Sequence, residues 1–367
     1  MSGSVYGTLF TIATWGESHG KGIGVVVDGC PAGLLLDEQY IQAYLNRRKP
    51  GQNKYSTPRK EDDKVSILSG IFEGRTTGTP ISLVVYNENQ KSGDYNNIAP
   101  AYRPGHADYC FDQKYGFRDY RGGGRSSGRE TIGRVAAGAI ACAILNELGI
   151  KVQAYTKAIG PISIDPAKAD LDNVPLSPLS MPDMEASDKA EEYLLEQMKD
   201  YNSVGGIIEC IVTGVPVGIG EPVFEKLDAS LAKAIMSIGA VKGVEVGDGF
   251  HVAELTGAEN NDPFITEEND TILKTTNHAG GILGGMSDGS NIILRAAIKP
   301  TPSIFKTQKT VNRDHENIDL KIQGRHDPVI VPRAVVVVES MVAITLVDQL
   351  FMGMTSQINK VKEFYKK

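Results

Sequence analysis

The sequence is poor in cysteine, and its apolar runs are interrupted by charge. Among 367 residues there are four cysteines, namely Cys30, Cys110, Cys142 and Cys210. They lie far apart and form no C-x-x-C pair, which argues against a zinc site and against a disulfide framework. The most apolar late segment, residues 328–351, contains Arg333, Glu339 and Asp348. We therefore expect no membrane span, and the simplest compartment is a reducing cytoplasm.

The sequence also lacks an excess of positive charge. Its formal net charge is -7 and its pI is near 5.5. Proteins that bind nucleic acids nonspecifically usually have a basic balance, so this function is disfavoured. Where basic residues do gather, we expect the cluster to have a local purpose.

Basic residues gather in front of the best predicted helix, within residues 117–149. The segment has a run of glycines at 122–124 and five arginines, at Arg118, Arg121, Arg125, Arg129 and Arg134. Apolar residues recur from 132 to 148 at three- and four-residue steps, which predicts a helix with one buried stripe. Ser127 and Glu130 have the spacing of a capping box, and Gly149 would end the helix. A helix N-terminus surrounded by arginines suits an anion with several oxygens, although a solvated charged face would look similar.

Two histidines are expected on turns. His19 lies in the turn 17–21 between two predicted strands, 5–16 and 22–30. His106 ends a long polar loop and lies close to a basic residue, Arg103. Either histidine could exchange protons near neutral pH, but a lone histidine is also often structural.

Other basic and glycine-rich segments could contribute to the same site. A helix predicted at 38–49 ends in basic residues that include Arg48, either for ligand binding or only as C-terminal caps. A second glycine-rich segment spans 275–289, and residues 324–328 precede a long apolar helix that starts near Pro332. Residues 27–33 resemble residues 212–218, and this weak echo suggests duplicated halves.

Common nucleotide-binding motifs do not fit. The glycine-rich run 122–128 lacks the lysine that a P-loop requires. Ser127 also stands where a dinucleotide-binding fingerprint needs its third glycine. Ordinary nucleotide folds are therefore disfavoured.

Three segments together resemble the chorismate synthase family. They are GESHGKGIGVVVDGCP at 16–31, GGGRSSGRETIGRVAAGA at 122–139, and GRHDP at 324–328 with the following VVVVESM. RPGHADY, MSIGAVKGVEVGDGF, NHAGGILGG and KPTPS occur in the family's order and spacing. The resemblance covers essentially the whole chain. It implies one domain over 1–367, an α+β fold with helices sandwiched between two antiparallel sheets.

The resemblance also implies an activity and its partners. The family's members are carbon–oxygen lyases that convert 5-enolpyruvylshikimate 3-phosphate to chorismate and phosphate, the last common step of the shikimate pathway. Their 1,4-elimination needs reduced FMN although there is no net redox change. Because no segment is large enough for an added reductase domain, we expect a monofunctional cytoplasmic enzyme that receives FMN from an external, NADP-linked reductant. The family further implies a homotetramer, with neither nucleic acid nor membrane as a partner.

Site residues follow from the matched motifs. By resemblance, His19 would protonate the leaving phosphate, His106 would act at the reduced flavin ring, and Asp327 would help to remove the ring proton. The residues expected to bind substrate are Arg48, Arg129, Arg325, Ser18 and Lys54. The residues expected to line FMN are Arg125, Ser126, Ser127, Gly239, Ala240, Gly284, Lys299, Pro300, Thr301, Pro302, Ser303 and Arg325. Lys54, Gly128 and Gly239 depart from the family's usual arginine, alanine and asparagine, which makes the role of Lys54 the least secure.

One alternative of a different class stays open at this point. The arginine-rich loop 118–134 could make the protein a noncatalytic polyanion- or RNA-binding protein, with Tyr115 and Tyr120 beside it. The acidic net charge and the two turn histidines count against this interpretation.

Overall fold

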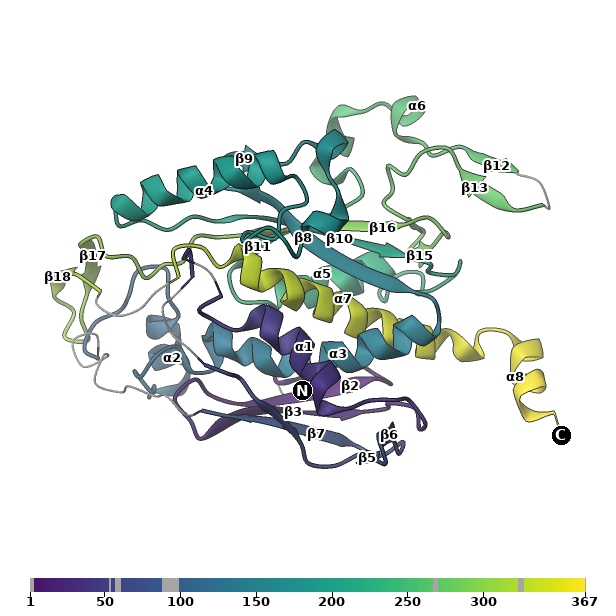
Figure 1. Ribbon diagram of the computed structural model, residues 1–367, viewed down its shortest axis with the longest axis horizontal. Coiled ribbons are helices and arrows are strands. Elements are labelled where there is room, and N and C mark those ends of the chain that lie inside the picture. Colours follow the sequence, from purple (N-terminus) through teal and green to yellow (C-terminus); the bar gives the residue numbers. More distant parts are fainter. Residues whose placement is uncertain are drawn as a thin grey trace.

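Helices lie between two antiparallel sheets, as Figure 1 shows for the computed structural model. The structure describes residues 3–52, 54–56, 61–87, 99–266, 270–322 and 327–366. Each sheet has five strands, and one buried apolar cluster includes residues of both sheets and of the helices between them. The predicted sandwich of helices between two antiparallel sheets is confirmed.

The first sheet is built from the N-terminal part of the chain, in the order β1-β2-β3-β7-β4. Its strands are β1 (Val5–Tyr6), β2 (Thr11–Gly16), β3 (Gly22–Asp28), β4 (Val65–Ile67) and β7 (Ile81–Tyr86). Side chains alternate between the faces, so Ile23, Val25 and Val27 enter the core. Trp15 pairs with Gly24 on the outer face and is 43% exposed. This outer face therefore carries large apolar side chains that are open to solvent.

The second sheet has the order β11-β16-β10-β8-β9. Its strands are β8 (Lys151–Ile159), β9 (Ile162–Ser163), β10 (Gly206–Thr213), β11 (Val241–Val246) and β16 (Ile292–Ile298). Along β10, Ile208, Cys210 and Val212 are fully buried and face the helices. Sequence patterns predict strands at 207–213, 241–246 and 291–298, which match β10, β11 and β16, but they predict no strand at β8.

Four helices form the middle layer: α1 (Glu38–Arg48), α3 (Thr131–Glu147), α5 (Leu227–Met236) and α7 (Val331–Met352). α3 and α7 pack closely, because Gly138 lets the backbone of α3 approach Ser340 and a Cβ there would lie 2.2 Å from that of Ser340. In the described part of the chain, α7 is the one helix long and apolar enough to cross a membrane, but 83% of its most apolar window is buried in the protein. That burial is typical of a core helix.

The remaining elements lie around this sandwich (Figure 1). The helices are α2 (Asp108–Tyr115), α4 (Met184–Lys199), α6 (Gly257–Asn260) and α8 (Ile358–Tyr365). The short strands are β5 (Ile71–Phe72), β6 (Arg75–Thr76), β12 (Phe264–Thr266), β13 (Ile272–Lys274), β14 (Ile282–Leu283), β15 (Met286–Ser287), β17 (Gln308–Val311) and β18 (Asn317–Leu320). The β12–β13 hairpin and α8 project away from the sandwich at the same end of the molecule.

The two halves of the chain repeat one topology. β2, β3, β7 and β4 adjoin in the same order as β8, β10, β16 and β11, and α1 and α5 follow the equivalent strands β3 and β10. The short sequence echo has matching backbone geometry. Gly29 and Gly214 have φ of 85° and 80°, while Gly33 and Gly218 have φ of 93° and 89°. The predicted half-repeat is therefore present in the fold.

The halves also share a hydrogen-bond pattern around a hydroxyl group. Thr76 Oγ1 donates to the Pro31 carbonyl at 2.6 Å and accepts from the Leu34 N–H at 3.0 Å. Ser287 Oγ donates to the Pro216 carbonyl at 2.6 Å and accepts from the Ile219 N–H at 2.9 Å. These bonds attach the hairpins β5–β6 and β14–β15 to the same place in each half.

The N-terminal strand differs from the prediction. Residues 5–16 do not form one strand, because Gly7 has φ of 95° and breaks the ladder between β1 and β2. The buried Asp348 carboxylate accepts hydrogen bonds from the backbone N–H groups of Thr8, Leu9 and Phe10 in this break. The charge that the sequence shows inside α7 is therefore used to hold a turn.

Candidate active site

His19 lies in the tight turn between β2 and β3. It is buried, and its Nδ1 lies 3.1 Å from the hydroxyl oxygen of Ser18. Gly122 lies directly against the imidazole, since a Cβ at Gly122 would be 2.8 Å from Nδ1 and Cε1 of His19. The first residue of the run 122–124 must therefore be glycine, because only glycine allows the backbone to lie this close to the His19 ring. Gly122 also has φ of 85°, which favours glycine.

His106 lies just before α2, beside a buried ion pair. Arg103 Nε donates to Asp108 Oδ2 at 2.7 Å, and Nη2 donates to Oδ1 at 2.6 Å. Asp108 Oδ1 also lies 3.1 Å from His106 Nδ1. Burial alone would raise the pKa of Asp108, but the hydrogen bonds from Arg103 and His106 hold that pKa well below its usual range. Asp108 is therefore a carboxylate at neutral pH.

One hydrogen bond joins the surroundings of the two histidines. Arg103 Nη2 donates to the Gly122 carbonyl at 3.0 Å. The loop that carries His106 is thus attached to the residue that packs against His19. Two segments that are far apart in the sequence meet here.

Two predicted substrate arginines share a buried carboxylate. Arg48 Nη2 lies 2.5 Å from Asp63 Oδ2, and Arg129 Nη1 lies 3.2 Å from Asp63 Oδ1. Arg129 Nη1 also pairs with Glu61. Arg48 Nε is buried and has no hydrogen-bond partner among the described residues. A buried donor of this kind is costly unless it is satisfied, so it is available to an anionic ligand.

Asn87 connects Arg129 to the His19 turn. Its Oδ1 accepts from Arg129 Nε at 3.1 Å and from Nη2 at 2.7 Å. Its Nδ2 donates to the carbonyls of Glu17 at 3.1 Å and Gly20 at 2.9 Å. The amide therefore fixes the arginine relative to the turn that carries His19.

Asp327 reaches the same network through Arg333. Arg333 Nη1 donates to Asp327 Oδ2 at 2.6 Å, and Arg333 Nε donates to the Arg48 carbonyl at 3.0 Å. Burial is the main reason why the pKa of Arg333 falls below its ordinary value, although Asp327 opposes that shift. Hydrogen bonds and ion pairs thus connect Asp327 through Arg333, Arg48, Asp63 and Arg129 to the turn of His19.

The helix behind this network begins later than predicted. Two short 3₁₀ turns, Gly124–Ser126 and Gly128–Glu130, precede α3, which starts at Thr131. Ser127 does cap the second turn, since its Oγ accepts from the Arg129 N–H at 3.3 Å. The capping-box prediction is wrong for Glu130, whose carboxylate accepts from Arg134 Nε at 2.9 Å. At the other end the prediction is confirmed, because Gly149 follows the helix with φ of 72°.

The five arginines of residues 118–134 do not form one open cluster. Arg118 is buried and donates to Asp112 and to backbone carbonyls, while the exposed Arg121 pairs with Asp119. Arg134 binds Glu130 and the Ser237 hydroxyl. The expectation that all five would surround one anion is therefore wrong, because protein carboxylates and carbonyls hold several of them.

Several residues expected to line a flavin do come together. The Lys299 N–H donates to the Ala240 carbonyl at 2.9 Å, and Lys299 Nζ donates to the Gly105 carbonyl at 2.7 Å. Ala240 has φ of 74°, which is strained for a residue with a side chain. Thr301 Oγ1 is buried without a hydrogen-bond partner among the described residues. Segment 299–303 thus lies against the His106 loop, and its Thr301 hydroxyl group is available for a ligand.

The other expected flavin residues belong to the loop before α3. Arg125 donates to Thr14 Oγ1 at 2.6 Å and to the Gly16 carbonyl at 3.1 Å, so it is anchored on β2. Ser126 Oγ donates to the Gly123 carbonyl at 2.7 Å. Both side chains already form hydrogen bonds within the protein. A ligand that contacts them would bind in addition to these partners.

Two expected residues stay outside this assembly. Gly284 lies in the β14–β15 turn, next to Gly285, whose carbonyl accepts from the first residue of α5, Leu227. Gly239 and Ala240 follow the last residue of α5, so the helix length of about 15 Å separates them from Gly284. Lys54 is mostly exposed and lies 3.5 Å from Glu191 on α4. Arg325 lies outside the described residues.

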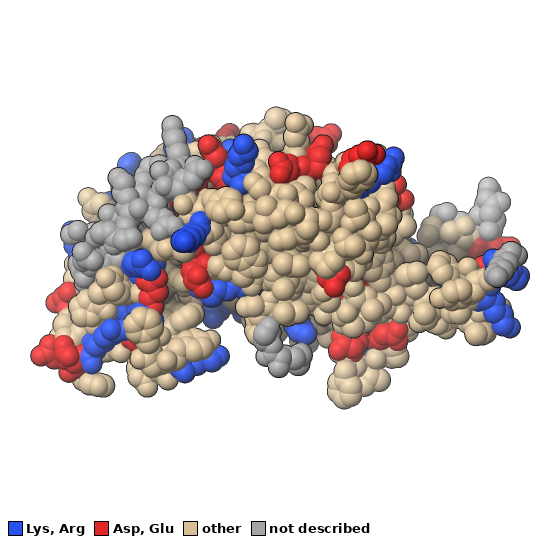
Figure 2. Space-filling model, turned by 90° about the horizontal axis from the view of Figure 1, so that it is seen from below, with Lys and Arg blue, Asp and Glu red and all other residues tan. Residues whose placement is uncertain are grey.

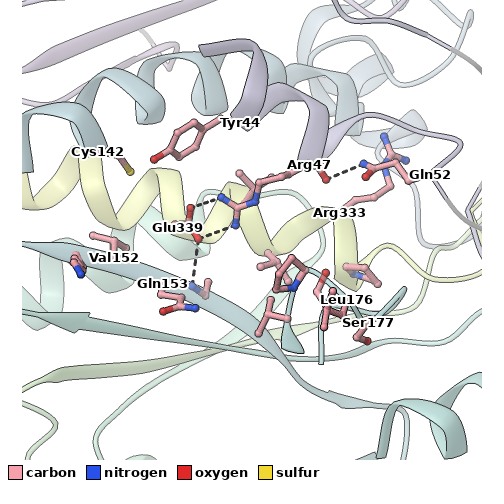
Figure 3. Close-up of a pocket in the computed structure, with 18 of the residues that line it drawn as sticks. Tyr44, Arg47, Gln52, Cys142, Val152, Gln153, Leu176, Ser177, Arg333 and Glu339 are labelled. Carbon is pink, nitrogen blue, oxygen red and sulfur yellow. Dashed lines mark hydrogen bonds and ion pairs between the residues drawn. The ribbon is translucent and has the colours of Figure 1, made fainter. Parts of the chain in front are cut away.

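A cavity of about 730 Å³ lies behind the network, between α1, α3, α7 and β8 (Figure 3). Arg47 crosses it and pairs with the buried Glu339 at 2.6 Å, and Glu339 also accepts from the backbone N–H of Ala154. Of the network residues, Arg333 lines this cavity, whereas neither histidine and none of the predicted catalytic residues does. The cavity therefore neighbours the candidate site without forming it.

Sequence reasoning missed the residues that hold the site together. Asn87, Asp63, Asp108 and Arg333 were not expected to contribute. Asp108 had a detectable signal, since it lies two residues after His106 in RPGHADY. The others have no local motif, because their partners are distant in the sequence.

Comparisons with known proteins agree with the motifs. The family model described as chorismate synthase matches residues 10–351. The chorismate synthase of Lachnoclostridium phytofermentans is 69% identical over 367 residues, which is 100% of both chains. That of Methanococcoides burtonii is 54% identical over 353 residues, covering 95% of this chain and 96% of its own. A crystal structure of chorismate synthase is 30% identical, with a TM-score of 0.77, and the match covers 98% of this chain and 96% of that one.

Proposed function

The chain belongs to the chorismate synthase family of lyases, and on that premise we propose how its residues divide the elimination of phosphate from 5-enolpyruvylshikimate 3-phosphate. The observation that carries the proposal is the continuous set of hydrogen bonds and ion pairs from Asp327 through Arg48 and Arg129 to the His19 turn. Acidic, basic and cationic groups at one place suit a substrate with a phosphate and two carboxylates.

The anion-binding part falls to the arginines. Arg48 offers its unpartnered Nε, and Arg129 lies on the same carboxylate, Asp63. Ser18 lies beside His19 and would hold a phosphate oxygen, and Arg325 would complete the set. Lys54 contributes least, because its ammonium lies with Glu191 on α4.

The proton-transfer part falls to three residues. His19 would donate a proton to the leaving phosphate, and the Ser18 hydroxyl at 3.1 Å orients its ring. Asp327, oriented by Arg333, would assist the removal of the ring proton. His106 would hold a proton next to the bound cofactor. General acid or base help of this kind is worth about two to four orders of magnitude in rate.

The residues around Ala240 and Thr301 fit a flavin. A buried hydroxyl without a partner, a strained backbone at Ala240 and open space beside Gly239 are features of a site shaped for a ligand. Gly239, Ala240 and Lys299–Ser303 would hold FMN, with Arg125, Ser126, Ser127 and Arg325. Reduced FMN, when bound, supplies the electron density that the elimination needs. A role for Gly284 at the same flavin would require a second copy of the chain.

The exposed apolar surfaces support a homotetramer. Tyr86 and Leu68 are each 60% exposed at the first sheet, and Figure 2 shows a view from below with few charged side chains near the middle of the molecule. On the projecting elements, Phe264 and Ile272 of β12–β13 are exposed, as is Phe364 of α8. Surfaces of this kind are usually covered by partners. The whole chain of 367 residues is proposed as one domain, because a single core cluster joins both halves.

The remaining partners follow from the family and from the charge. We propose a cytoplasmic, monofunctional enzyme that obtains reduced FMN from an external NADP-linked reductase and binds neither nucleic acid nor membrane. The alternative, RNA or polyanion binding through residues 118–134, has less support, because Arg118, Arg121 and Arg134 are held by protein groups.

The test is direct. Purified protein is mixed anaerobically with chemically reduced FMN and 5-enolpyruvylshikimate 3-phosphate, and phosphate and chorismate are measured. Phosphate release that depends on both additions supports the proposal. Absence of release, with flavin binding verified by its absorbance, would overturn it.

A further inference from the structure

We propose that Arg103 and Asp108 are positioning residues, with Arg103 holding the imidazoles of both His19 and His106 and Asp108 holding that of His106. This inference rests on the proposed roles of the two histidines. It adds two side chains that touch neither substrate nor cofactor in the proposed function and that act through other residues.

The Arg103–Asp108 pair is rigid. Both side chains are 5% exposed, and the two carboxylate oxygens accept separately from Nε and Nη2 of Arg103. The Arg103 backbone N–H donates to Asp108 Oδ2 at 3.0 Å as well. A two-pronged contact with a third bond to the main chain leaves the carboxylate little freedom to rotate.

The hydrogens of Arg103 Nη2 decide which nitrogen of His106 carries a proton. Nη2 has two hydrogens, and its acceptors at 2.6 Å and 3.0 Å are Asp108 Oδ1 and the Gly122 carbonyl. No hydrogen of Nη2 is left for His106 Nδ1, although the two atoms lie 3.1 Å apart. His106 Nδ1 must therefore donate its own hydrogen to Asp108 Oδ1, and the neutral ring presents Nε2 as its acceptor.

The same guanidinium acts on His19 through Gly122. The carbonyl that accepts from Nη2 belongs to the residue that packs against the His19 ring. If Arg103 releases this carbonyl, the wall behind His19 is free to move. Asp108 thus orients one histidine, whereas Arg103 constrains both.

A double-mutant cycle separates these effects. Asp108→Asn in the otherwise unchanged protein is expected to lower kcat at least about tenfold, with KM for the substrate nearly unchanged. In a His106→Ala background the same substitution should lower kcat less than about twofold, because the imidazole that Asp108 orients is absent. Arg103→Lys should still lower kcat in the His106→Ala background, because it also acts on His19. That decrease in kcat should disappear only in the double background His106→Ala, His19→Ala.

A matched control lies on the same helix. Asp112 also pairs with two arginines, Arg118 and Arg313. Among the described residues, Asp112 has no histidine partner. Asp112→Asn should leave kcat within about twofold in either background. Melting temperatures of all variants report any loss of stability, and if Asp108→Asn does not fold, Arg103→Lys supports the same cycle.

A second measurement uses no flavin. Nitrogen NMR of the imidazole groups in flavin-free protein, assigned with His106→Ala, should show His106 protonated at Nδ1. In Asp108→Asn the signal should shift toward a mixture of the two tautomers. An unchanged tautomer, or an Asp108→Asn cost that is equal with and without His106, would overturn the inference. Full activity of His106→Ala would instead refute the proposed role of His106 itself.

Discussion

Asp327 and Arg333 form a hydrogen-bonded ion pair of 2.6 Å at the start of α7, and the same guanidinium donates to the carbonyl of Arg48. A residue proposed to take part in proton removal is thus attached to a residue proposed to bind substrate. The contact spans the two halves of the chain, because Arg48 belongs to α1 and Arg333 to α7.

The first prediction concerns this pair. Arg333→Lys keeps a positive charge, but a single ammonium does not reproduce two fixed contacts in different directions. We expect kcat to fall at least about tenfold and the melting temperature to fall only slightly. Phosphate release under anaerobic conditions measures kcat, and a thermal scan measures the melting temperature. Arg313→Lys, at an exposed arginine that pairs with Asp112, is the control and should change neither.

The second prediction concerns the proposed catalytic groups. His106→Ala and Asp327→Asn should each lower turnover at least about tenfold while the fold is kept. The physical reason is the loss of a proton-transfer group whose side chain contributes little to the core. Circular dichroism and melting curves check the fold. A drop in activity that only parallels a drop in stability would make these residues structural.

The third prediction concerns Gly122. A Cβ at this position would lie 2.8 Å from the His19 ring, and φ of 85° disfavours any side chain. Gly122→Ala should therefore displace His19 and lower kcat by about tenfold or more. Gly116→Ala tests the backbone cost alone, since Gly116 has φ of 70° with no atom within 4 Å of the added Cβ. Equal activity of the two variants would contradict the proposed contact.

The fourth prediction concerns the carboxylate between two arginines. The Asp63 side chain is fully buried against Arg48 and close to Arg129. Asp63→Asn would leave two cationic groups without their shared anion, at a cost of about 3–5 kcal/mol in the free energy of unfolding. Urea denaturation measures this cost. Asp62→Asn, one residue earlier, should change stability by less than about 0.5 kcal/mol.

The fifth prediction concerns the acid stability of an arm formed by residues 256–266 and 270–279, which contains α6 and the β12–β13 hairpin. Burial would raise the pKa of Asp262, but hydrogen bonds from Thr276, from backbone N–H groups and from Lys274 hold it well below the usual value. A lowered folded-state pKa stabilises the arm above the ordinary carboxyl pKa of about 4 and loses that effect as the pH falls below it. Protection of the arm against hydrogen exchange, relative to the intrinsic exchange rate at each pH, should therefore fall below about pH 4. Asp262→Asn should show the lower protection already at pH 7.

How much the sequence predicts depends on how local the cause is. The stripe of α3 and the glycine that ends α3 were predictable, because each depends on neighbours within one or two turns. The bounds of α1 and β11 agree with the prediction almost residue for residue. The Glu130 cap was wrong because Arg134, one turn further on, competes for the same carboxylate.

For the candidate site, the sequence predicts residues but not their arrangement. Motifs predict His19, His106, Arg129 and Asp327 as site residues, and hydrogen bonds and ion pairs connect their surroundings in the structure. The same motifs counted Lys54 and Gly284, which the fold places elsewhere. The motifs do not show that Gly284 and Gly239 will lie at opposite ends of α5.

By itself, then, the amino-acid order determined most of the helices and strands and the family, and it indicated duplicated halves, since periodicity, turn residues and motif spacing are properties of the chain. Only the tertiary structure decided which carboxylate faces which arginine. Contacts such as that of Arg103 with Gly122 or of Arg333 with Arg48 exist because two sheets and the helices between them pack in one register. That packing depends on the shape of the whole core, which no single segment contains.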